Sequence, residues 1–317
     1  MLGFWHVHAA DYARLAQDHP DTEVVAVWDE DPDRGRAGAR DFGVEYAADL
    51  ADLLARDDVD AVTITTATAA HRDVMVAAAE AGKHIFTEKL LAPTVAEVEE
   101  IVAAADAAGV ALVVSLPRLY HGSTRVVAGV LADGALGRLT YGRVRLSHDG
   151  AVAGWLPERF FDPRQAIGGA LTDLGCHPVY LIQRFLGADP DTVSATYRSL
   201  TGRAVEDHAV VTVGYADRRI GVIEAGFVSA APFTIELHGT EAILLYSDAG
   251  GALRVSGGEG WTELPVPDDG EDAFGQWVGH IRAGSRADDN LARAAELTRL
   301  VVAANEAAAT GRTLTYP

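Results

Sequence analysis

Short apolar runs rich in β-branched residues alternate with longer helical stretches over roughly the first 118 residues. The runs predict strands at 1–4, 23–28, 61–65, 84–87 and 111–116. The stretches between them predict helices at 10–18, 32–42, 48–56, 71–81 and 95–108. Strands that alternate with helices at this spacing form βαβ units. We therefore predict an α/β domain at 1–118, a doubly wound Rossmann domain with a parallel sheet.

The pattern changes from about residue 138, where longer strands of alternating polarity follow one another. These strands are predicted at 139–148, 192–198, 209–215, 220–228, 234–238 and 242–246. Helices are predicted at 170–186 and 290–309. Strands segregated from helices in this way favour an α+β domain with a mostly antiparallel open sheet, which we place at 119–317.

A chain of 317 residues suits two such domains. Although 49% of the residues are hydrophobic, no apolar stretch approaches the roughly 18 residues that span a bilayer, and no signal sequence follows Met1. The single cysteine, Cys176, cannot form an intramolecular disulfide, which fits a reducing compartment. We therefore expect a cytoplasmic protein that does not bind membranes.

The formal net charge of −20 argues against nucleic acid and anionic membranes as partners, because phosphate groups need a basic face. The basic residues are almost all arginine, and Lys83 and Lys89 are the two lysines of the chain. An ammonium is compact and can release its proton, so a lysine retained here is a candidate for a role that a guanidinium cannot fill. Lys83 can equally be an ordinary surface residue.

The first predicted strand leads into a turn that reads Gly3-Phe4-Trp5-His6-Val7-His8. At this position a Rossmann domain binds a dinucleotide pyrophosphate, with backbone amides at a helix N-terminus. Of the G-x-G-x-x-G fingerprint Gly3 alone is present, because Trp5 and His8 stand at the second and third glycine positions. We expect Gly3, Phe4, Trp5 and His6 to contact the cofactor, although the bulky side chains put the close approach of backbone and pyrophosphate in doubt.

The second predicted strand ends in Asp29, 21 positions after His8. A carboxylate at this place accepts hydrogen bonds from the adenosine ribose. Together with Glu30 and Asp31 it would repel a 2′-phosphate, which favours NAD over NADP as the cofactor. The alternative is that Asp29 only opens a solvated turn.

Polar residues follow two further predicted strands at their carboxyl ends, where ligands bind in open α/β sheets. Thr66 and His71 follow one strand, and Glu88 and Lys89 follow the next; we expect all four to contact the cofactor. The Lys89 ammonium could also donate to a substrate hydroxyl and stabilise its negative charge as the proton leaves. The alternative is a structural salt bridge between Lys89 and Glu88 or another carboxylate.

A second cluster lies in Gly168-Gly169-Ala-Leu-Thr-Asp173-Leu-Gly-Cys-His177-Pro178. Asp173 and His177 are four residues apart, so on one helix they would face the same way. A histidine held by a carboxylate suits a general base that takes a hydroxyl proton near neutral pH. However, Pro178 could start the helix at His177 and leave Asp173 on a loop, and such a pair can also be a structural hydrogen bond.

These segments together resemble the Gfo/Idh/MocA family of oxidoreductases over nearly the whole chain. The resemblance rests on the apolar strand ending in Asp29-Glu-Asp-Pro, Thr-Ala-Thr-Ala-Ala-His71, Ala-Gly-Lys83-His-Ile-Phe-Thr-Glu88-Lys89, Gly168-Gly169-x3-Asp173-x-Gly-x-His177, His238-Gly-Thr-Glu241 and Ala-Thr-Gly-Arg312. It implies a catalytic trio in which His177 is the general acid/base, Asp173 its orienting partner or a substrate contact, and Lys89 the polarising cation.

The resemblance also implies substrate contacts and an oligomer. We expect Tyr120, Arg118 and Trp155 to contact the substrate together with Asp173 and His177. Among the first three, Tyr120 is the strongest candidate. The open face of the second sheet is expected to form a homodimer or homotetramer interface. Relatives usually have proline after Glu-Lys, whereas this chain has Leu90, so we expect a trans Lys89–Leu90 peptide.

The prediction is therefore an NAD-dependent oxidoreductase that transfers hydride between a nicotinamide and a secondary alcohol or ketone of a sugar, cyclitol or related polyol. It requires Lys89 and His177, from separate domains, to converge where the nicotinamide binds. One alternative is a non-catalytic dinucleotide-binding regulator of the same fold, which the glycine-poor turn favours. Another is a metal-dependent hydrolase that uses His6 and His8, although its barrel would need eight βα units. The oxidoreductase itself needs no metal.

Overall fold

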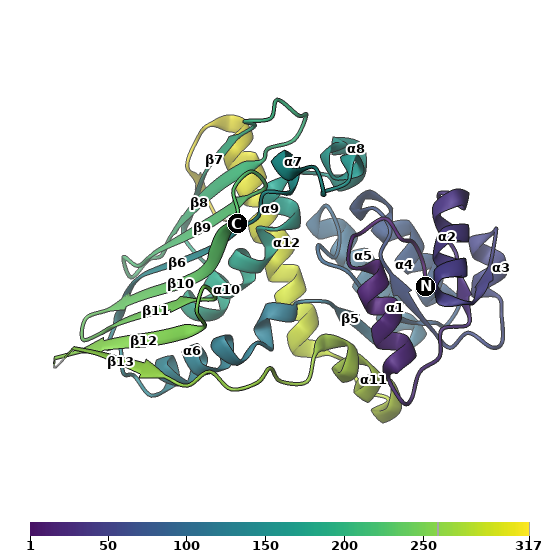
Figure 1. The fold of residues 1–317 in the computed structure, drawn as a ribbon, viewed down its shortest axis with the longest axis horizontal. Coiled ribbons are helices and arrows are strands. Elements are labelled where there is room, and N and C mark those ends of the chain that lie inside the picture. Colours follow the sequence, from purple (N-terminus) through teal and green to yellow (C-terminus); the bar gives the residue numbers. More distant parts are fainter. Residues whose placement is uncertain (259, 317) are drawn as a thin grey trace. The chain divides into compact units, whose positions relative to one another are not determined.

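A computed structural model describes residues 1–258 and 260–316, and the chain divides into two units (Figure 1). The first unit comprises Met1–Ser115 and Glu271–Thr298, and the second comprises Leu116–Gly270 and Arg299–Pro317. The sequence predicts a boundary at residue 118 and a second domain that continues unbroken from there. The structure instead places 271–298 with the first unit.

The sheet of the first unit is parallel, as predicted. Its central strands are β3 (Ala61–Ile64), β4 (His84–Thr87) and β5 (Leu112–Val114), with β4 in the middle. Strands β1 (Ala26–Val27) and β2 (Glu45–Tyr46) form a second parallel pair. Leu2 forms parallel bridges to both Trp28 and Ile64, so the expected first strand is reduced to this single connecting position.

Local capping defines the helices of this unit. In α2 (Pro32–Phe42) the Asp31 side chain accepts from the amides of Asp33 and Arg34, and Gly43 ends the helix in the left-handed conformation. In α5 (Val95–Ala108) the Thr94 hydroxyl accepts from the Glu97 amide. The other helices that precede residue 116 are α1 (Ala9–Asp18), α3 (Leu50–Leu54), α4 (His71–Glu80) and the short η1 (Thr68–Ala70).

The segment 271–298 belongs to the first unit because it packs on the central strands. Helix α11 (Ala273–Ala283) buries Phe274 and Trp277, whose ring centroids lie 5.4 and 5.7 Å from that of Phe86 in β4. The Trp277 indole N–H donates to the Ala111 carbonyl oxygen at 3.3 Å. Helix α12 (Asp288–Thr310) begins in the first unit and ends in the second.

The second unit contains a nine-stranded sheet in the order β13-β12-β11-β10-β6-β9-β8-β7-β14 (Figure 1). Strands β6 (Leu139–Ser147) and β9 (Ile220–Gly226) pair in parallel. The other neighbouring strands of this sheet, within the described residues, pair antiparallel, so the sheet is mostly antiparallel as predicted. The remaining strands are β7 (Thr192–Arg198), β8 (His208–Gly214), β10 (Ala231–Gly239), β11 (Ile243–Ser247), β12 (Ala252–Gly257), β13 (Gly260–Leu264) and β14 (Leu314–Thr315).

One face of this sheet is covered by α10 (Cys176–Leu186). The helix approaches closely because the facing strands carry glycine. A Cβ atom on Gly142 would lie 3.0 Å from the Leu186 side chain, and one on Gly221 would lie 3.0 Å from that of Ile182. The other helices of the unit are α6 (Gly122–Ala132), α7 (Gly150–Ala153), α8 (Pro163–Ala166), α9 (Ala170–Asp173), η2 (Pro117–Leu119) and η3 (Glu158–Phe161).

Three expectations need correction. The predicted helix 170–186 is two helices, because α9 ends at Asp173 and α10 begins at Cys176, with Pro178 in its first turn where proline is tolerated. Helices α6 and α11 and strands β12 and β13 were not predicted. The Lys89–Leu90 peptide is cis. The expectation of a trans bond was wrong, since it weighed the intrinsic preference of the bond alone.

Among the described residues, no helix combines the length and the apolar character that crossing a bilayer requires.

Candidate functional site

The first βα turn of the first unit requires glycine at Gly3 and at no other position. Gly3 has φ +86°, and a Cβ atom there would lie 2.8 Å from the backbone nitrogen of Thr66. Trp5 is buried, and His8 is the N-cap residue of α1 with its side chain 38% exposed. The second and third positions of the fingerprint thus hold side chains, one directed into the core and one partly exposed.

Asp29 lies at the end of β1 and is 2% exposed, so it does not open a solvated turn. Its two carboxylate oxygens accept four hydrogen bonds, from the amides of Phe4 (2.6 Å) and Asp31 (2.8 Å) and from two nitrogens of Arg34 (2.8 and 2.6 Å). Arg34 also contacts the exposed Glu30 at 2.9 Å. A carboxylate has about four lone-pair positions, so the protein itself satisfies Asp29.

Thr66 and His71 each carry a buried polar atom without a hydrogen-bond partner in the described part of the chain. These atoms are Thr66 Oγ1 and His71 Nε2. The other ring nitrogen of His71 lies 2.9 Å from the Leu90 carbonyl oxygen. Buried polar groups normally find a partner, so a hydroxyl left open beside Gly3 fits a region that receives a polar ligand.

Glu88 is the centre of a polar network at the carboxyl end of β4. Its Oε2 atom accepts from the Tyr12 hydroxyl at 2.7 Å and lies 2.9 Å from His8 Nδ1 and 3.4 Å from His6 Nδ1. Its Oε1 atom accepts from the Lys89 amide at 2.9 Å. Burial would raise the pKa of Glu88, but the charges of His6, Lys89 and His8 outweigh it and hold that pKa well below the usual carboxyl range. Glu88 is therefore an ionised, buried carboxylate.

The Lys89 side chain is 2% exposed and lies beside this network. Its Nζ atom is 3.3 Å from His6 Nε2 and 3.9 Å from Glu88 Oε1. The expected salt bridge to Glu88 is thus present, at the limit of contact distance, together with an imidazole contact. Lys83, by contrast, donates to the Arg56 carbonyl oxygen at 2.9 Å and has a structural role.

His6, His8 and Glu88 have ligand atoms within 4.8 Å of one another, a donor set that suits zinc. The neighbouring ammonium argues against this use, because Lys89 Nζ lies against the His6 ring and would repel a divalent cation. The hydrolase alternative also needs a barrel, which the parallel sheet of the first unit and the mixed sheet of the second do not form.

In the second unit, His177 lies in the first turn of α10 and is buried. Its Nδ1 atom lies 2.8 Å from the Tyr180 hydroxyl, which in turn accepts from the Arg118 amide at 3.0 Å. Asp173 is half-buried at the end of α9 and so does not share a helix with His177. Glu206 holds the start of α9, because its carboxylate accepts from the amides of Gly169 and Leu171.

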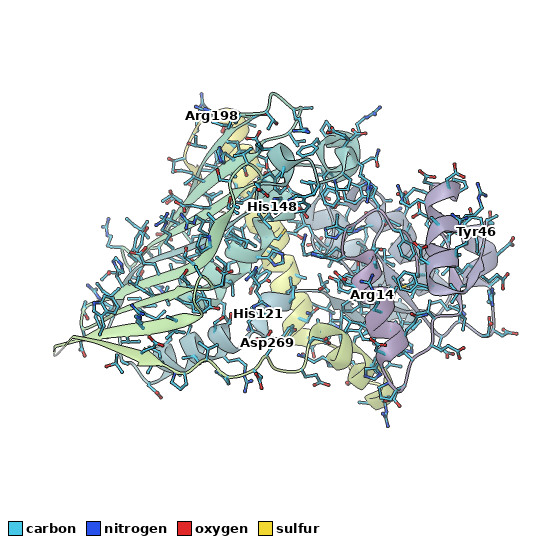
Figure 2. The ribbon with its side chains drawn as sticks, viewed as in Figure 1. Arg14, Tyr46, His121, His148, Arg198 and Asp269 are labelled. Carbon is cyan, nitrogen blue, oxygen red and sulfur yellow. The ribbon has the colours of Figure 1, made fainter. Side chains whose placement is uncertain are left out.

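The expected substrate residues occupy different surroundings. The Arg118 guanidinium lies 4.1 Å above the Phe233 ring, and burial lowers its pKa. The Tyr120 carbonyl oxygen accepts from the Gly270 amide. Trp155 is 52% exposed, donates to Asp149 at 3.2 Å and lies 4.6 Å from the ring of His148, which Figure 2 labels.

Three residues of these networks are not among the site residues predicted from the sequence, namely Tyr12, Arg34 and Tyr180. A helical spacing rule could have found two of them. Tyr12 follows His8 by four residues on α1, and Tyr180 follows His177 by three on α10, so each pair shares a helix face. No local signal distinguishes Arg34 from the other arginines of α2.

A cavity of about 570 Å³ in the first unit lies at the other end of the strands, lined among others by Met1, Ala26, Ala61 and Trp277. The Met1 amino group donates to the Ala26 carbonyl oxygen, and burial lowers its pKa to about 5. Gly3, Asp29 and Lys89 lie at the carboxyl ends of the parallel strands and do not line this cavity, so it is separate from the candidate site.

Comparison with known proteins identifies the family. Residues 2–116 match the oxidoreductase family with an NAD-binding Rossmann fold, and residues 124–245 match the GFO/IDH/MocA C-terminal domain. The chain belongs to the Gfo/Idh/MocA family. It is accordingly an NAD(P)-dependent oxidoreductase that acts on CH–OH groups.

The chain is also similar to individual curated proteins. A 1,5-anhydro-D-fructose reductase from Ensifer adhaerens is 29% identical over 77% of this chain and 75% of the relative. The chain spans 58% of the length of a dTDP-3,4-didehydro-2,6-dideoxy-alpha-D-glucose 3-reductase from Streptomyces antibioticus and 64% of that of a D-apiose dehydrogenase from Paraburkholderia graminis.

Solved structures share the fold. An oxidoreductase from Agrobacterium radiobacter, solved with NAD+, L-tartaric acid and magnesium, has a TM-score of 0.85 at 22% identity, covering 99% of this chain and 97% of the other. A 3-ketoreductase from Actinomadura kijaniata, solved with NADP and TDP-benzene, has a TM-score of 0.86 at 22% identity, covering 96% of both chains.

Proposed function

We propose that this family member transfers hydride between NAD and a secondary alcohol or ketone of a sugar, cyclitol or related polyol. The buried Lys89 at the carboxyl end of β4, held beside an ionised Glu88, carries the proposal. An ammonium at this end of a parallel strand is suited to polarise a substrate oxygen. The relative named for 1,5-anhydro-D-fructose supports a sugar-like substrate.

The residues of the first unit fit a bound dinucleotide. The tight turn at Gly3 and the open Thr66 hydroxyl beside it leave backbone and polar groups for a ligand. Phe4, Trp5, His6 and His71 would line this region, with Glu88 and Lys89 at its nicotinamide end. When bound, the cofactor supplies the hydride acceptor or donor.

His177 and Lys89 would divide the proton chemistry. Lys89 would donate a hydrogen bond to the substrate oxygen and stabilise its developing charge, and His177 would take or give the hydroxyl proton. Asp173 would orient His177 or hold a neighbouring hydroxyl. Tyr120 first, then Arg118 and Trp155, would contact the rest of the substrate.

NAD is the proposed cofactor because Asp29 and Glu30 follow β1, at the position where a Rossmann domain contacts the adenosine ribose, and their carboxylates would repel a 2′-phosphate. Asp29 is already satisfied by protein donors, so its contribution would be repulsion of that phosphate. Glu30, which is exposed beside it, is the carboxylate with room for ribose hydroxyls.

We also propose a homodimer or homotetramer through the open face of the nine-stranded sheet. Val210, Ile220 and Leu245 are exposed on its strands, and apolar side chains on a sheet face favour association. Cys176, the single cysteine of the sequence, is buried and cannot form an intramolecular disulfide, which supports a reducing, cytoplasmic location.

Fluorescence titration with NADH, followed by a polyol library screened for NADH production, tests the function. We expect saturable binding that Gly3→Glu abolishes, because any side chain at Gly3 collides with the Thr66 backbone. Binding without turnover on any polyol or ketone would instead favour the regulator, whose case rests on the filled glycine positions at Trp5 and His8. Absence of binding at millimolar NADH would exclude both.

A further inference from the structure

His177 is not paired through Nδ1 with a carboxylate but with a phenol. The Tyr180 hydroxyl lies 2.8 Å from His177 Nδ1, and the two rings meet edge to face with centroids 5.6 Å apart. Both residues are buried on the same turn of α10. A ring nitrogen engaged at this distance is not available to a substrate, so proton exchange with a substrate would use the other ring nitrogen, Nε2.

The position of the Tyr180 hydroxyl is itself fixed. It accepts a hydrogen bond from the Arg118 amide at 3.0 Å, and that amide belongs to η2, which lies 62 residues earlier in the chain. A backbone N–H can only donate, so this contact anchors the oxygen whatever the orientation of its proton. The Tyr180 hydroxyl thereby connects the His177 ring to the segment that carries Arg118 and Tyr120.

A hydroxyl oxygen at this place suits a ring whose Nε2 atom accepts a proton. In the neutral base the ring proton lies on Nδ1 and is donated to the Tyr180 oxygen, which leaves Nε2 unprotonated; a hydroxyl that donated to Nδ1 would put the ring proton on Nε2 instead. In the imidazolium Nδ1 still donates to the same oxygen. Tyr180 can therefore hold the ring in one orientation in both protonation states of a catalytic cycle.

We propose that Tyr180 is a positioning residue that reserves Nε2 of His177 for proton transfer and ties the ring to the substrate-binding segment at Arg118. This inference rests on the proposed function. In alcohol oxidation the hydroxyl proton would move to Nε2 of His177, and a bound NAD+ would accept the C–H hydride with its electron pair as the carbonyl forms. In reduction both transfers run in reverse, and in neither direction does Tyr180 lose its own proton.

The test compares Tyr180→Phe with Tyr197→Phe. Tyr197 is the control, because it is another tyrosine of the second unit whose hydroxyl makes a side-chain hydrogen bond, to Asn305 at 2.8 Å, although its ring is half-buried and that of Tyr180 is buried. We expect Tyr180→Phe to lower kcat by about ten- to a hundredfold with KM within about twofold, since a misplaced catalytic group costs rate more than binding. The control should stay within about twofold of wild type.

Nitrogen NMR provides a readout that a merely structural role would not move. The ¹⁵N shifts of the His177 ring, assigned by difference with His177→Gln, report the ratio of its two neutral tautomers. We expect this ratio to change at least about twofold in Tyr180→Phe and not in Tyr197→Phe, because Nδ1 loses its partner in the first variant alone.

Each outcome decides the inference. A lower kcat together with an altered tautomer ratio supports it. An unchanged ratio overturns it even if activity falls, since the loss is then structural, and an unchanged kcat overturns the positioning role even if the ratio moves. If the wild-type protein turns over no substrate, the proposed function fails, yet the NMR comparison still shows whether Tyr180 controls His177.

Discussion

The Nδ1 atom of His71 lies 2.9 Å from the carbonyl oxygen of Leu90, the residue that follows Lys89. A second carbonyl, that of Leu91, lies 3.2 Å from the same nitrogen. Carbonyl oxygens only accept, so Nδ1 carries the proton and Nε2 is the basic nitrogen. This buried ring therefore fixes the backbone immediately after the candidate catalytic lysine, in its neutral form.

His71 should make the stability of the protein depend on pH. Burial, which outweighs the two carbonyl contacts, lowers the pKa of His71 below its ordinary value of 6.5. Above 6.5 the ring is neutral both folded and unfolded. As the pH falls below 6.5 the unfolded chain binds a proton that the folded ring refuses, so stability decreases by up to ~1.4 kcal/mol per pH unit until the folded pKa is passed.

Urea unfolding between pH 7.5 and 5.5 measures this effect. We expect His71→Gln to be less stable than wild type at pH 7.5 and to lose less stability on acidification. His19→Gln is the control, because the His19 ring contacts an exposed turn at Asp21. Parallel pH dependences for wild type and His71→Gln would show that this ring is not the group responsible.

The cofactor preference should depend on Asp29. In the folded protein this carboxylate accepts hydrogen bonds from two nitrogens of Arg34. A guanidinium released from it could pair with a phosphate. Asp29→Ser should release the guanidinium and remove a repelling charge, which we expect to raise the affinity for NADPH relative to NADH by about tenfold or more. Fluorescence titration with both dinucleotides gives the ratio.

Asp33→Ser is the control for this change. It removes an acidic residue of α2, the helix that contains Arg34, and Asp33 pairs with Arg36 on the surface. An equal shift of the NADPH-to-NADH ratio in both variants would mean that overall charge, and not the release of Arg34, sets the preference.

Lys89 and His177 should each be needed for turnover and not for cofactor binding. We expect Lys89→Met and His177→Ala to lower kcat by about a hundredfold or more while the Kd for NADH changes little. Lys83→Met is a matched control for the first variant, since Lys83 is the other lysine of the chain and binds a backbone carbonyl. Comparable loss of NADH binding in both variants would count against the assigned roles.

Local signals account for the parts of the fold that were predicted well. Helix α2 has the predicted bounds because Asp31, Pro32 and Gly43 define its ends within the segment itself. Alternating polarity likewise located β6 and β7 and the mostly antiparallel sheet. Such signals depend on neighbours in sequence, so a single chain is enough to detect them.

Long-range packing accounts for what was missed. The assignment of 271–298 to the first unit depends on Trp277 meeting Ala111, which is 166 residues away. Similarly, Asp29 was expected to face a ribose, but its hydrogen-bonding capacity is taken up by Phe4 and Arg34. Neither arrangement follows from periodicity or from a motif, because the partner is chosen by the tertiary fold.

The contribution of 271–298 to the first unit can be measured through Trp277. This side chain is buried against Phe86 and Phe274, so Trp277→Ala should destabilise the first unit by about 3–5 kcal/mol. Trp261→Ala is the matched control, because that tryptophan is exposed on β13 and its loss should cost less than about 0.5 kcal/mol.

Amide hydrogen exchange locates the destabilisation. In Trp277→Ala we expect exchange to accelerate in β4 and β5, whose strands the indole covers, and to stay near wild-type rates in β8 of the second unit. The Val114 amide is the most direct probe, because Asn290 of the same returning segment accepts its hydrogen bond at 2.8 Å. Equal acceleration in β5 and β8 would mean that 271–298 supports both units alike, contrary to the division that the contacts of Trp277 and Asn290 describe.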